Sequence, residues 1–248
     1  MCTVLLAWKV APDASIVVGA NRDEFRERSA EAPKLLVKEP AVYGGRDALA
    51  GGTWLAVAPG VGKVAAVTNR ITGASRGIRD DRKRSRGELP VLALQQDDAT
   101  VRTWMEQLTP EDYNPVNLLY ISLEKALWLS LDPDAGARIM DIVPGVHVIT
   151  IGDMDGVELP KDVRLQQKLS HEGSAPMHSS DIITKFHDIL CDHDPEHAVC
   201  IHGGMYGTVS SSTVVVRGAG EVDYAHAQGF PCEVGWSPIM HSGWRKDP

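Results

Sequence analysis

The chain opens with Met1-Cys2-Thr3-Val4-Leu5-Leu6-Ala7-Trp8, and the second decisive stretch reads Gly19-Ala20-Asn21-Arg22-Asp23-Glu24. Residues 3–8 and 15–19 are apolar runs with β-branched members, and the tetrad 11–14 between them, with its proline, is typical of a turn. This pattern predicts an N-terminal β-hairpin. Because antiparallel strands joined by a short turn have their open ends side by side, we expect Cys2 and Asp23 to be neighbours.

Cys2 is the candidate nucleophile. Removal of Met1, which a small second residue permits, would leave one residue with both a thiol and a free α-amine. A thiol with a pKa of about 8.5 is mostly protonated at neutral pH, whereas an α-amine titrates at about 7.7–8.0 and can act as its base. This is the N-terminal-amine form of nucleophilic catalysis. The alternative is a small buried apolar residue in a first strand.

The composition is that of a globular protein, with 43% hydrophobic and 23% charged residues among 248. We expect a single domain over residues 1–248. A formal net charge of −8 disfavours nucleic-acid binding, and no apolar run approaches the roughly 20 residues that span a bilayer. The N-terminus lacks the basic region of a secretory signal, so the expected location is the cytoplasm.

The cysteines and histidines give no strong metal signal. The four cysteines, at positions 2, 191, 200 and 232, form no CxxC pair, so we expect reduced thiols and no bound metal. Metal-compatible groups do occur together, at His187, Asp192, His193, Asp194 and His197. Pro195 breaks the helical spacing of this run, so a solvated turn is favoured over a metal site.

The rest of the chain alternates between groups of strands and groups of helices. A second hairpin is predicted from strands 53–57 and 63–68, ending at Asn69. Residues 24–40 are expected to wrap the surface, and the glycine pairs at 44–45 and 51–52 to bracket a loop. Helices are predicted over 88–96, 100–108 and from Ser179 or Ser180 to Cys191, and further strands over 117–123, 126–131, 137–142, 147–151, 198–201, 212–217 and 221–225. This order favours an α+β fold with helices packed on antiparallel sheets, for which a four-layer αββα sandwich is one solution.

A basic island interrupts the acidic average between residues 70 and 86. Seven cations face two carboxylates there: Arg70, Arg76, Arg79, Arg82, Lys83, Arg84 and Arg86 against Asp80 and Asp81. A solvated loop is the first interpretation, and an anion-binding segment is the second.

Several short motifs together resemble one known family. They are Met1-Cys2-Thr3, Asn21-Arg22-Asp23-Glu24, Gly51-Gly52-Thr53-Trp54-Leu55, Val67-Thr68-Asn69, Arg86-Gly87-Glu88-Leu89, Asn117-Leu118 and Tyr206-Gly207-Thr208. In this order they resemble the NRDE family, also called the transport and Golgi organisation family. The resemblance implies an N-terminal nucleophile (Ntn) hydrolase, hence an αββα sandwich and removal of Met1. The chain is more remotely similar to the cysteine branch with penicillin V acylase and conjugated bile-acid hydrolase.

The resemblance also assigns roles at the site. It implies that Asp23 and Asn21 hold the Cys2 amine and that Asn69 donates a hydrogen bond to the developing oxyanion. The distant relatives have an arginine where this chain has alanine at position 20, and Arg22 is the candidate to replace it. Two departures are expected to alter the site. Family members commonly have a Ser-Asn pair where this chain has Thr150-Ile151, and an arginine where it has Val209.

The predicted function is an N-terminal cysteine amidohydrolase or acyltransferase. It would act on a non-peptide C–N bond of a small-molecule amide or acyl substrate, through an acyl-thioester at Cys2 and without a cofactor. The alternative is a non-catalytic binding or trafficking protein for haem or another hydrophobic cofactor, with Cys2 or a histidine as ligand and the basic island near the propionates. The sequence does not indicate the oligomeric state.

Overall fold

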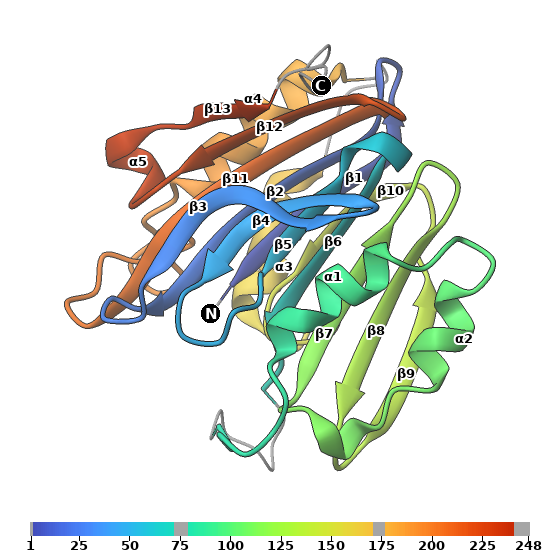
Figure 1. Ribbon diagram of the computed structural model, residues 1–248. Helices are drawn as coiled ribbons and strands as arrows, with labels where there is room; N and C mark the ends of the chain where they lie inside the picture. The colour runs from blue at the N-terminus through green and yellow to red at the C-terminus, as the bar shows by residue number, and fades with distance from the viewer. Residues whose placement is uncertain (1, 72–78, 171–176, 241–248) are drawn as a thin grey trace.

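The computed structural model describes residues 2–71, 79–170 and 177–240, which form a mixed α+β fold on two antiparallel sheets (Figure 1). The first sheet has the strand order β10 (Gly145–Ile149), β1 (Thr3–Ala11), β2 (Ala14–Phe25), β11 (Tyr206–Gly218), β12 (Glu221–Ala227) and β13 (Ser237–Met240). The second follows the chain: β3 (Ala30–Lys38), β4 (Ala41–Asp47), β5 (Leu55–Ala58), β6 (Lys63–Asn69), β7 (Val116–Ile121), β8 (Ala126–Asp132) and β9 (Gly136–Asp141).

The helices are short and lie outside the two sheets. They are α1 (Leu89–Leu94), α2 (Val101–Glu106), α3 (Pro160–Leu169), α4 (Ser179–Leu190) and α5 (Pro231–Val234). In Figure 1, α1 and α2 lie in front of the second sheet, while α3 and α4 lie behind the first. Within the described part of the chain, no helix has the length and apolar character to cross a membrane.

Strand alternation explains why β1 is buried on both faces. Successive side chains of a strand point to opposite faces of its sheet. Val4 and Leu6 belong to an apolar core with Leu119 of the second sheet, whereas Leu5 belongs to another core with Phe186 of α4. The first sheet therefore packs against the second sheet on one side and against helices on the other.

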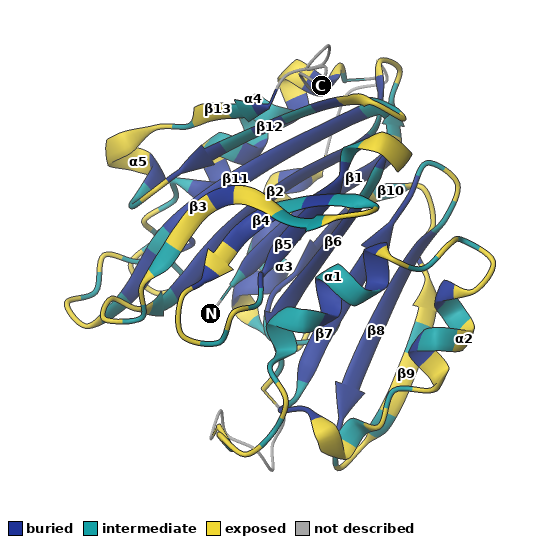
Figure 2. Cartoon of the chain, viewed as in Figure 1, coloured by how far each residue is buried: buried dark blue, intermediate teal, exposed yellow. Residues whose placement is uncertain are grey.

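The second sheet is also covered on both faces along its middle strands. Its outer face forms a further core with α1 and α2, which contribute Leu89 and Met105. Figure 2 shows burial along β5 to β8, while β3 and β9 at the two edges carry exposed residues. The sheet is therefore fully sheltered only in its centre.

Both predicted hairpins are confirmed. In the first, Thr3 lies opposite Asn21, which places the end of β2 beside the start of β1. In the second, Ala56 of β5 lies opposite Ala65 of β6. The helix predicted from Ser179 or Ser180 is α4, although its N-cap is His178.

Other predictions of elements were wrong. Residues 24–40, expected to wrap the surface, are largely exposed but contain a strand that was not predicted, β3. It is an edge strand whose proline is tolerated because an edge needs fewer backbone donors. The glycines at 44–45 lie within β4, so the loop that they were expected to open starts only after Asp47. Residues 198–201 are not a strand, because the backbone N–H groups of Val199 and Cys200 donate to the Asp192 carbonyl. The polar stretch after residue 151 contains α3, and β13 and α5 follow β12; the pattern predicted none of these three elements.

Candidate active site

Cys2 lies just before β1, at the wall of a cleft of about 280 Å³. The end of β2, the segment before β5, the end of β6 and the segment leading to α1 form the other walls. Because Thr3 pairs with Asn21, Cys2 lies beside Arg22 in the extended register. The hairpin therefore brings Cys2 and the Asn21 to Glu24 block together, as the sequence predicts.

The thiol of Cys2 is not activated by its surroundings alone. Burial raises the pKa of the Cys2 thiol, and the nearby Asp23 carboxylate acts in the same direction. A hydrogen bond from the Asp23 backbone and the charge of Arg22 oppose this rise, but the pKa remains above its ordinary value. A base is therefore needed to remove the proton at neutral pH.

Asp23 is held firmly in a buried position. The hydroxyl of Thr208 donates to Asp23 Oδ1 at 2.7 Å, and the hydroxyl of Tyr206 donates to the Asp23 backbone carbonyl at 3.1 Å. Burial raises the pKa of the Asp23 carboxyl, and the positive charge of Lys161 opposes that rise. Both residues of β11 belong to the Tyr206-Gly207-Thr208 motif, which thus fixes the candidate orienting carboxylate.

Lys161 is a functional candidate that the sequence pattern missed. It lies in the first turn of α3, is buried, and donates from Nζ to the Ala198 carbonyl at 3.0 Å. Burial lowers the pKa of Lys161, while the charges of Asp23 and Cys2 raise it. A lysine in a polar stretch carries no signal of this proximity, because only the packing of α3 against the first sheet creates it.

Asn21 and Asn69 occupy different surroundings. Asn21 is buried and donates from Nδ2 to the carbonyls of Leu190 and Val199, at 2.8 and 3.0 Å. Its amide therefore ties β2 to the end of α4 and does not line the cleft. Asn69, the last residue of β6, does line the cleft with Cys2.

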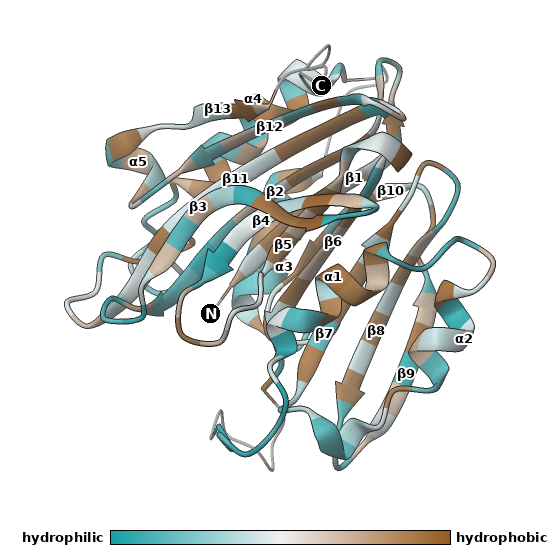
Figure 3. Cartoon of the chain, in the orientation of Figure 1, coloured by the Kyte–Doolittle hydropathy of each residue, from teal (hydrophilic) through white to brown (hydrophobic). Residues whose placement is uncertain are grey.

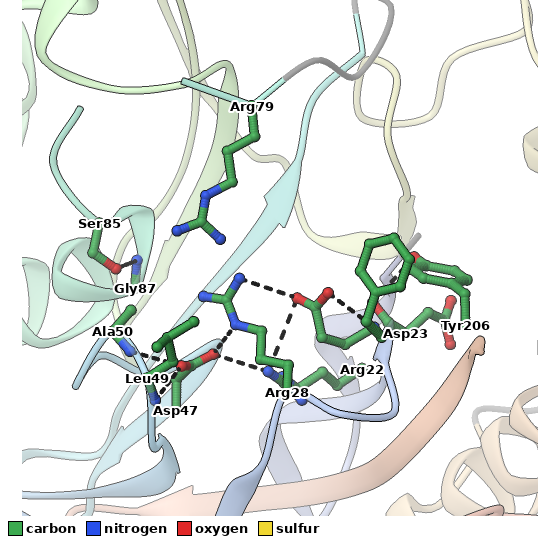
Figure 4. Close-up of polar contacts among 12 residues, drawn as sticks. Arg22, Asp23, Arg28, Asp47, Leu49, Ala50, Arg79, Ser85, Gly87 and Tyr206 are labelled. Carbon is green, nitrogen blue, oxygen red and sulfur yellow. Dashed lines mark hydrogen bonds and ion pairs between the residues drawn. The ribbon is translucent and has the colours of Figure 1, made fainter. Parts of the chain in front are cut away.

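Arg22 is the centre of a group of charged side chains that forms part of one wall of the cleft. Arg22 Nη2 and Arg28 Nε both donate to Asp47 Oδ2, at 2.9 and 2.8 Å (Figure 4). The other oxygen of Asp47 accepts the backbone N–H groups of Leu49 and Ala50. The Arg22 guanidinium also lies 4.7 Å from the ring centroid of Trp54. Arg22 thus has a structural role, in addition to its effect on the Cys2 thiol.

Two of the short glycine motifs meet at the cleft. The Thr53 N–H donates to the Gly87 carbonyl at 2.8 Å. A Cβ at Gly52 would lie 2.5 Å from the Gly87 carbonyl carbon, so the two backbones touch. Glycine at position 52 is therefore required by close approach, and this contact joins two walls of the cleft.

The basic island contributes much of the cleft. Arg79, Lys83, Arg84 and Arg86 line it, and the segment is markedly hydrophilic (Figure 3). Burial lowers the pKa of Arg86 to about 10, and the charge of Cys2 opposes this shift. Arg86 therefore remains a cation at neutral pH. Among the described lining residues, six cations stand against four carboxylates. Arg76 lies outside the described residues.

The two departures from the family pattern lie away from Cys2. Neither Ile151 nor Val209 is among the described residues that line the cleft. Val209 lies at a bulge of β11 and lines a neighbouring pocket with Arg26 and Phe230. The backbone carbonyl of Ile151 accepts the N–H of Ile71 at 3.0 Å. The wall beside Cys2 is thus polar and charged despite these two apolar residues.

The histidine-containing run after α4 does not form the metal site considered from its sequence. The ring of His187 stacks on Trp236 with centroids 3.8 Å apart. Asp192 pairs with Arg164 at 2.8 Å and with Lys168. Of the run, His193 alone joins a cluster of potential metal ligands within the described segments, and its other members come from elsewhere.

Comparison with known proteins agrees with the motifs that converge on this cleft. The family model described as Transport and Golgi organisation 2 matches residues 1–228. The chain is also 25% identical, over 262 aligned residues, to the Transport and Golgi organization protein 2 homolog of Bos taurus. That alignment covers 90% of this chain and 91% of the bovine protein.

Proposed function

We propose that this chain, which belongs to the Transport and Golgi organisation 2 family, is an N-terminal cysteine amidohydrolase or acyltransferase for small anionic substrates. The observation that carries the proposal is the position of Cys2, at the wall of a basic cleft and beside the buried Asp23. Family membership alone does not specify this chemistry. The proposal rests on which groups surround the thiol.

The proposed reaction begins once Met1 has been removed. The α-amine of Cys2 takes the thiol proton, and the sulfur attacks the substrate carbonyl carbon to form a C–S bond. The amine then returns the proton to the leaving nitrogen as the C–N bond breaks. Water hydrolyses the resulting thioester, or a second amine accepts the acyl group. Because the pKa of the Cys2 thiol is raised, the reaction needs a base next to the sulfur, and this supports a role for the α-amine of the same residue.

Three side chains would assist these steps. Asp23, fixed by Thr208, would orient the α-amine through a hydrogen bond. Asn69 would donate to the oxyanion, a contribution worth about 3 kcal/mol in comparable sites. Lys161 would balance the charge of Asp23 from the side of α3. Asn21 would act indirectly, because its amide is committed to the Leu190 and Val199 carbonyls.

The charge of the cleft supports the substrate class. Arg79 and Arg86 line the same cleft as Cys2. Arg79 Nε pairs with Asp81 at 2.7 Å and Arg86 Nη1 donates to the Pro115 carbonyl at 3.2 Å, so each guanidinium keeps further N–H groups for a ligand. Guanidinium groups bind carboxylates and phosphates through paired hydrogen bonds. We therefore infer a small amide or acyl compound that carries a carboxylate or phosphate near the scissile bond.

The same proposal includes the Ntn type of four-layer αββα sandwich. Separate apolar cores between the sheets, between the first sheet and α3 and α4, and between the second sheet and α1 and α2 support this arrangement. Cys2 directly precedes β1, an inner strand of the first sheet, and a nucleophile at the start of the chain is what that fold type requires.

Acyl trapping at Cys2 tests the proposal. The protein is treated with the p-nitrophenyl monoester of succinate, an anionic acyl donor, and digested for mass mapping. We expect an acyl adduct on the N-terminal peptide, and we expect it to be lost when neutral hydroxylamine is added to the folded protein before digestion. Hydroxylamine cleaves thioesters but spares amides, and it must act before the acyl group can pass from the Cys2 sulfur to the α-amine of the same residue. The adduct should be absent from Cys2→Ala and present in Cys191→Ala, whose thiol has intermediate exposure and lies outside the cleft. An adduct that persists in Cys2→Ala, or none in the parent chain, contradicts the proposal.

The carrier hypothesis has a separate test. Haem is added to the parent chain and to Cys2→Ala, and the Soret band is followed. Saturable binding that depends on Cys2 would favour the carrier, whereas no saturable spectral change would end it. The carrier has weaker support, because charged groups line much of the cleft, including Arg28 and Asp47.

A further inference from the structure

Four potential metal ligands converge beyond the end of α4. The ligand atoms of His193, Cys200, His202 and Cys232 all lie within 4.8 Å of one another. Cys200 is buried and the other three are exposed, so the group is open to solvent on one side. None of the four is among the described residues that line the Cys2 cleft. The cluster is therefore separate from the candidate active site.

The distances within the cluster match a shared tetrahedral metal ion. Cys200 Sγ and Cys232 Sγ are 3.7 Å apart, and two thiolates at about 2.3 Å from one tetrahedral zinc ion would be about 3.8 Å apart. His202 Nε2 lies 3.2 Å from Cys232 Sγ, against about 3.5 Å for a nitrogen and a sulfur on the same ion. A disulfide would require about 2.05 Å between the sulfurs.

His202 is oriented as a metal ligand would be. Its ring stacks on Phe230 with centroids 3.7 Å apart. Its Nε2 points to Cys232, while its Nδ1 faces Glu233 Oε1 at 3.6 Å. A carboxylate behind the second ring nitrogen is the usual outer partner of a metal-bound histidine, because it fixes the tautomer and the ring.

The backbone brings the remaining ligands together. The Asp192 carbonyl accepts the N–H of Cys200 at 2.9 Å, which holds Cys200 against the residue after Asp192. That residue is His193, whose ring meets the His202 ring edge-on with centroids 4.6 Å apart. Cys232 arrives from α5. The site thus joins a short stretch that contains His193, Cys200 and His202 to Cys232, which follows His202 by 30 residues.

We propose that His193, Cys200, His202 and Cys232 bind a soft divalent metal ion, with zinc as the best match. Two sulfur and two nitrogen ligands in tetrahedral arrangement favour zinc among the common divalent ions. Both thiols would bind as thiolates and release their protons to solvent. The two thiolate charges then neutralise those of the ion, which suits a partly buried site.

The position of this site gives it a structural role near Asp23. Ile201, between two of the ligands, donates its N–H to Thr208 Oγ1 and accepts the Thr208 N–H, each at 2.9 Å. The Thr208 hydroxyl in turn donates to Asp23. A metal that fixes residues 200–202 therefore also fixes the partner of Asp23.

Metal analysis of the untagged full chain tests this proposal. We expect about one zinc per chain by elemental analysis, and replacement by cobalt should give the visible absorption of a tetrahedral thiolate complex. Cys232→Ser should weaken zinc binding more than about 100-fold, and Glu233→Gln by about 10- to 100-fold. Cys191→Ser and His197→Ala are matched controls, because they change neighbouring residues outside the cluster, and they should bind as the parent chain does.

Three outcomes would overturn the proposal. They are substoichiometric zinc with no cobalt–thiolate spectrum in the parent chain, an equal loss in His197→Ala and Cys232→Ser, or a Cys200–Cys232 disulfide in the isolated protein. The cobalt spectrum of the parent chain decides the matter even where a variant fails to fold. Cys2→Ala should retain the metal, so this result is independent of the acyl-trapping experiment.

Discussion

The thiol of Cys2 lies among groups that pull its pKa in opposite directions. Burial and Asp23 raise the pKa, while Arg22 and the Asp23 backbone lower it. Arg22 was the candidate to replace the arginine of the distant relatives, and its guanidinium is bound to Asp47. Arg86, which lines the same cleft, also interacts with the Cys2 charge. A thiolate formed there lies in a cleft whose described lining carries more cations than carboxylates, which favours anionic partners.

Alkylation at Cys2 should depend on the charge of the reagent. Peptide mapping gives the alkylation rate of each cysteine with iodoacetate and with iodoacetamide. We expect the ratio of the two rates to be at least about three times as high at Cys2 as at Cys191. Added salt should lower the ratio at Cys2. Arg79→Gln should reduce the ratio at Cys2, because Arg79 lines the cleft. Arg102→Gln is the control, since Arg102 pairs with Asp141 away from the cleft. A ratio at Cys2 unaffected by salt and by Arg79→Gln would count against an anion-binding cleft.

Single residues were predictable where they are close in sequence or belong to one hairpin. The pairing of Cys2 with the Asp23 block follows from strand alternation and a short turn. Lys161 was not predictable, because its approach to Asp23 depends on where α3 packs. Asn21 was placed on the correct strand, but strand pattern alone could not show that its amide donates to the carbonyls of Leu190, the last residue of α4, and Val199.

At the scale of the elements, one backbone contact joins two walls of the cleft. It lies between Gly52, in the segment before β5, and Gly87, in the segment before α1. Gly52→Ala should destabilise the fold by about 1–3 kcal/mol, because its Cβ would meet the Gly87 backbone, which cannot move like a flexible side chain. Urea unfolding measures this loss. Gly60→Ala is the matched control, since a Cβ there meets nothing within 4 Å. Equal midpoints for the two variants would show that the walls are not held by this contact.

The helices and strands differ in how clearly the local sequence pattern predicts them. Inner strands such as β6 and β8 were predicted because each carries four consecutive apolar residues. The edge strand β3 was missed, because an exposed edge tolerates the charges and proline that are typical of a loop. The short helix α5 was missed because four residues carry no helical period.

At the scale of the whole molecule, the site exists only because both sheets and the basic segment meet. Cys2 and Asp23 come from the first sheet, Asn69 ends a strand of the second, and Arg86 precedes α1. The α+β class and the hairpins followed from the sequence, but the strand order did not. β10 joins β1 in the first sheet, although all seven strands of the second sheet, together with α1 and α2, lie between β2 and β10 in the chain. Such long-range pairing leaves no local pattern.

The central claim is that the α-amine of Cys2 serves as the base for its own thiol. The most direct measurement is the steady-state hydrolysis of succinyl p-nitrophenyl ester by two forms of the chain. One form begins at Cys2, confirmed by intact mass, and the other has a single glycine before Cys2. The account predicts a rate at least about 100-fold lower in the extended form, because the thiol loses its base. Equal rates in the two forms would contradict it.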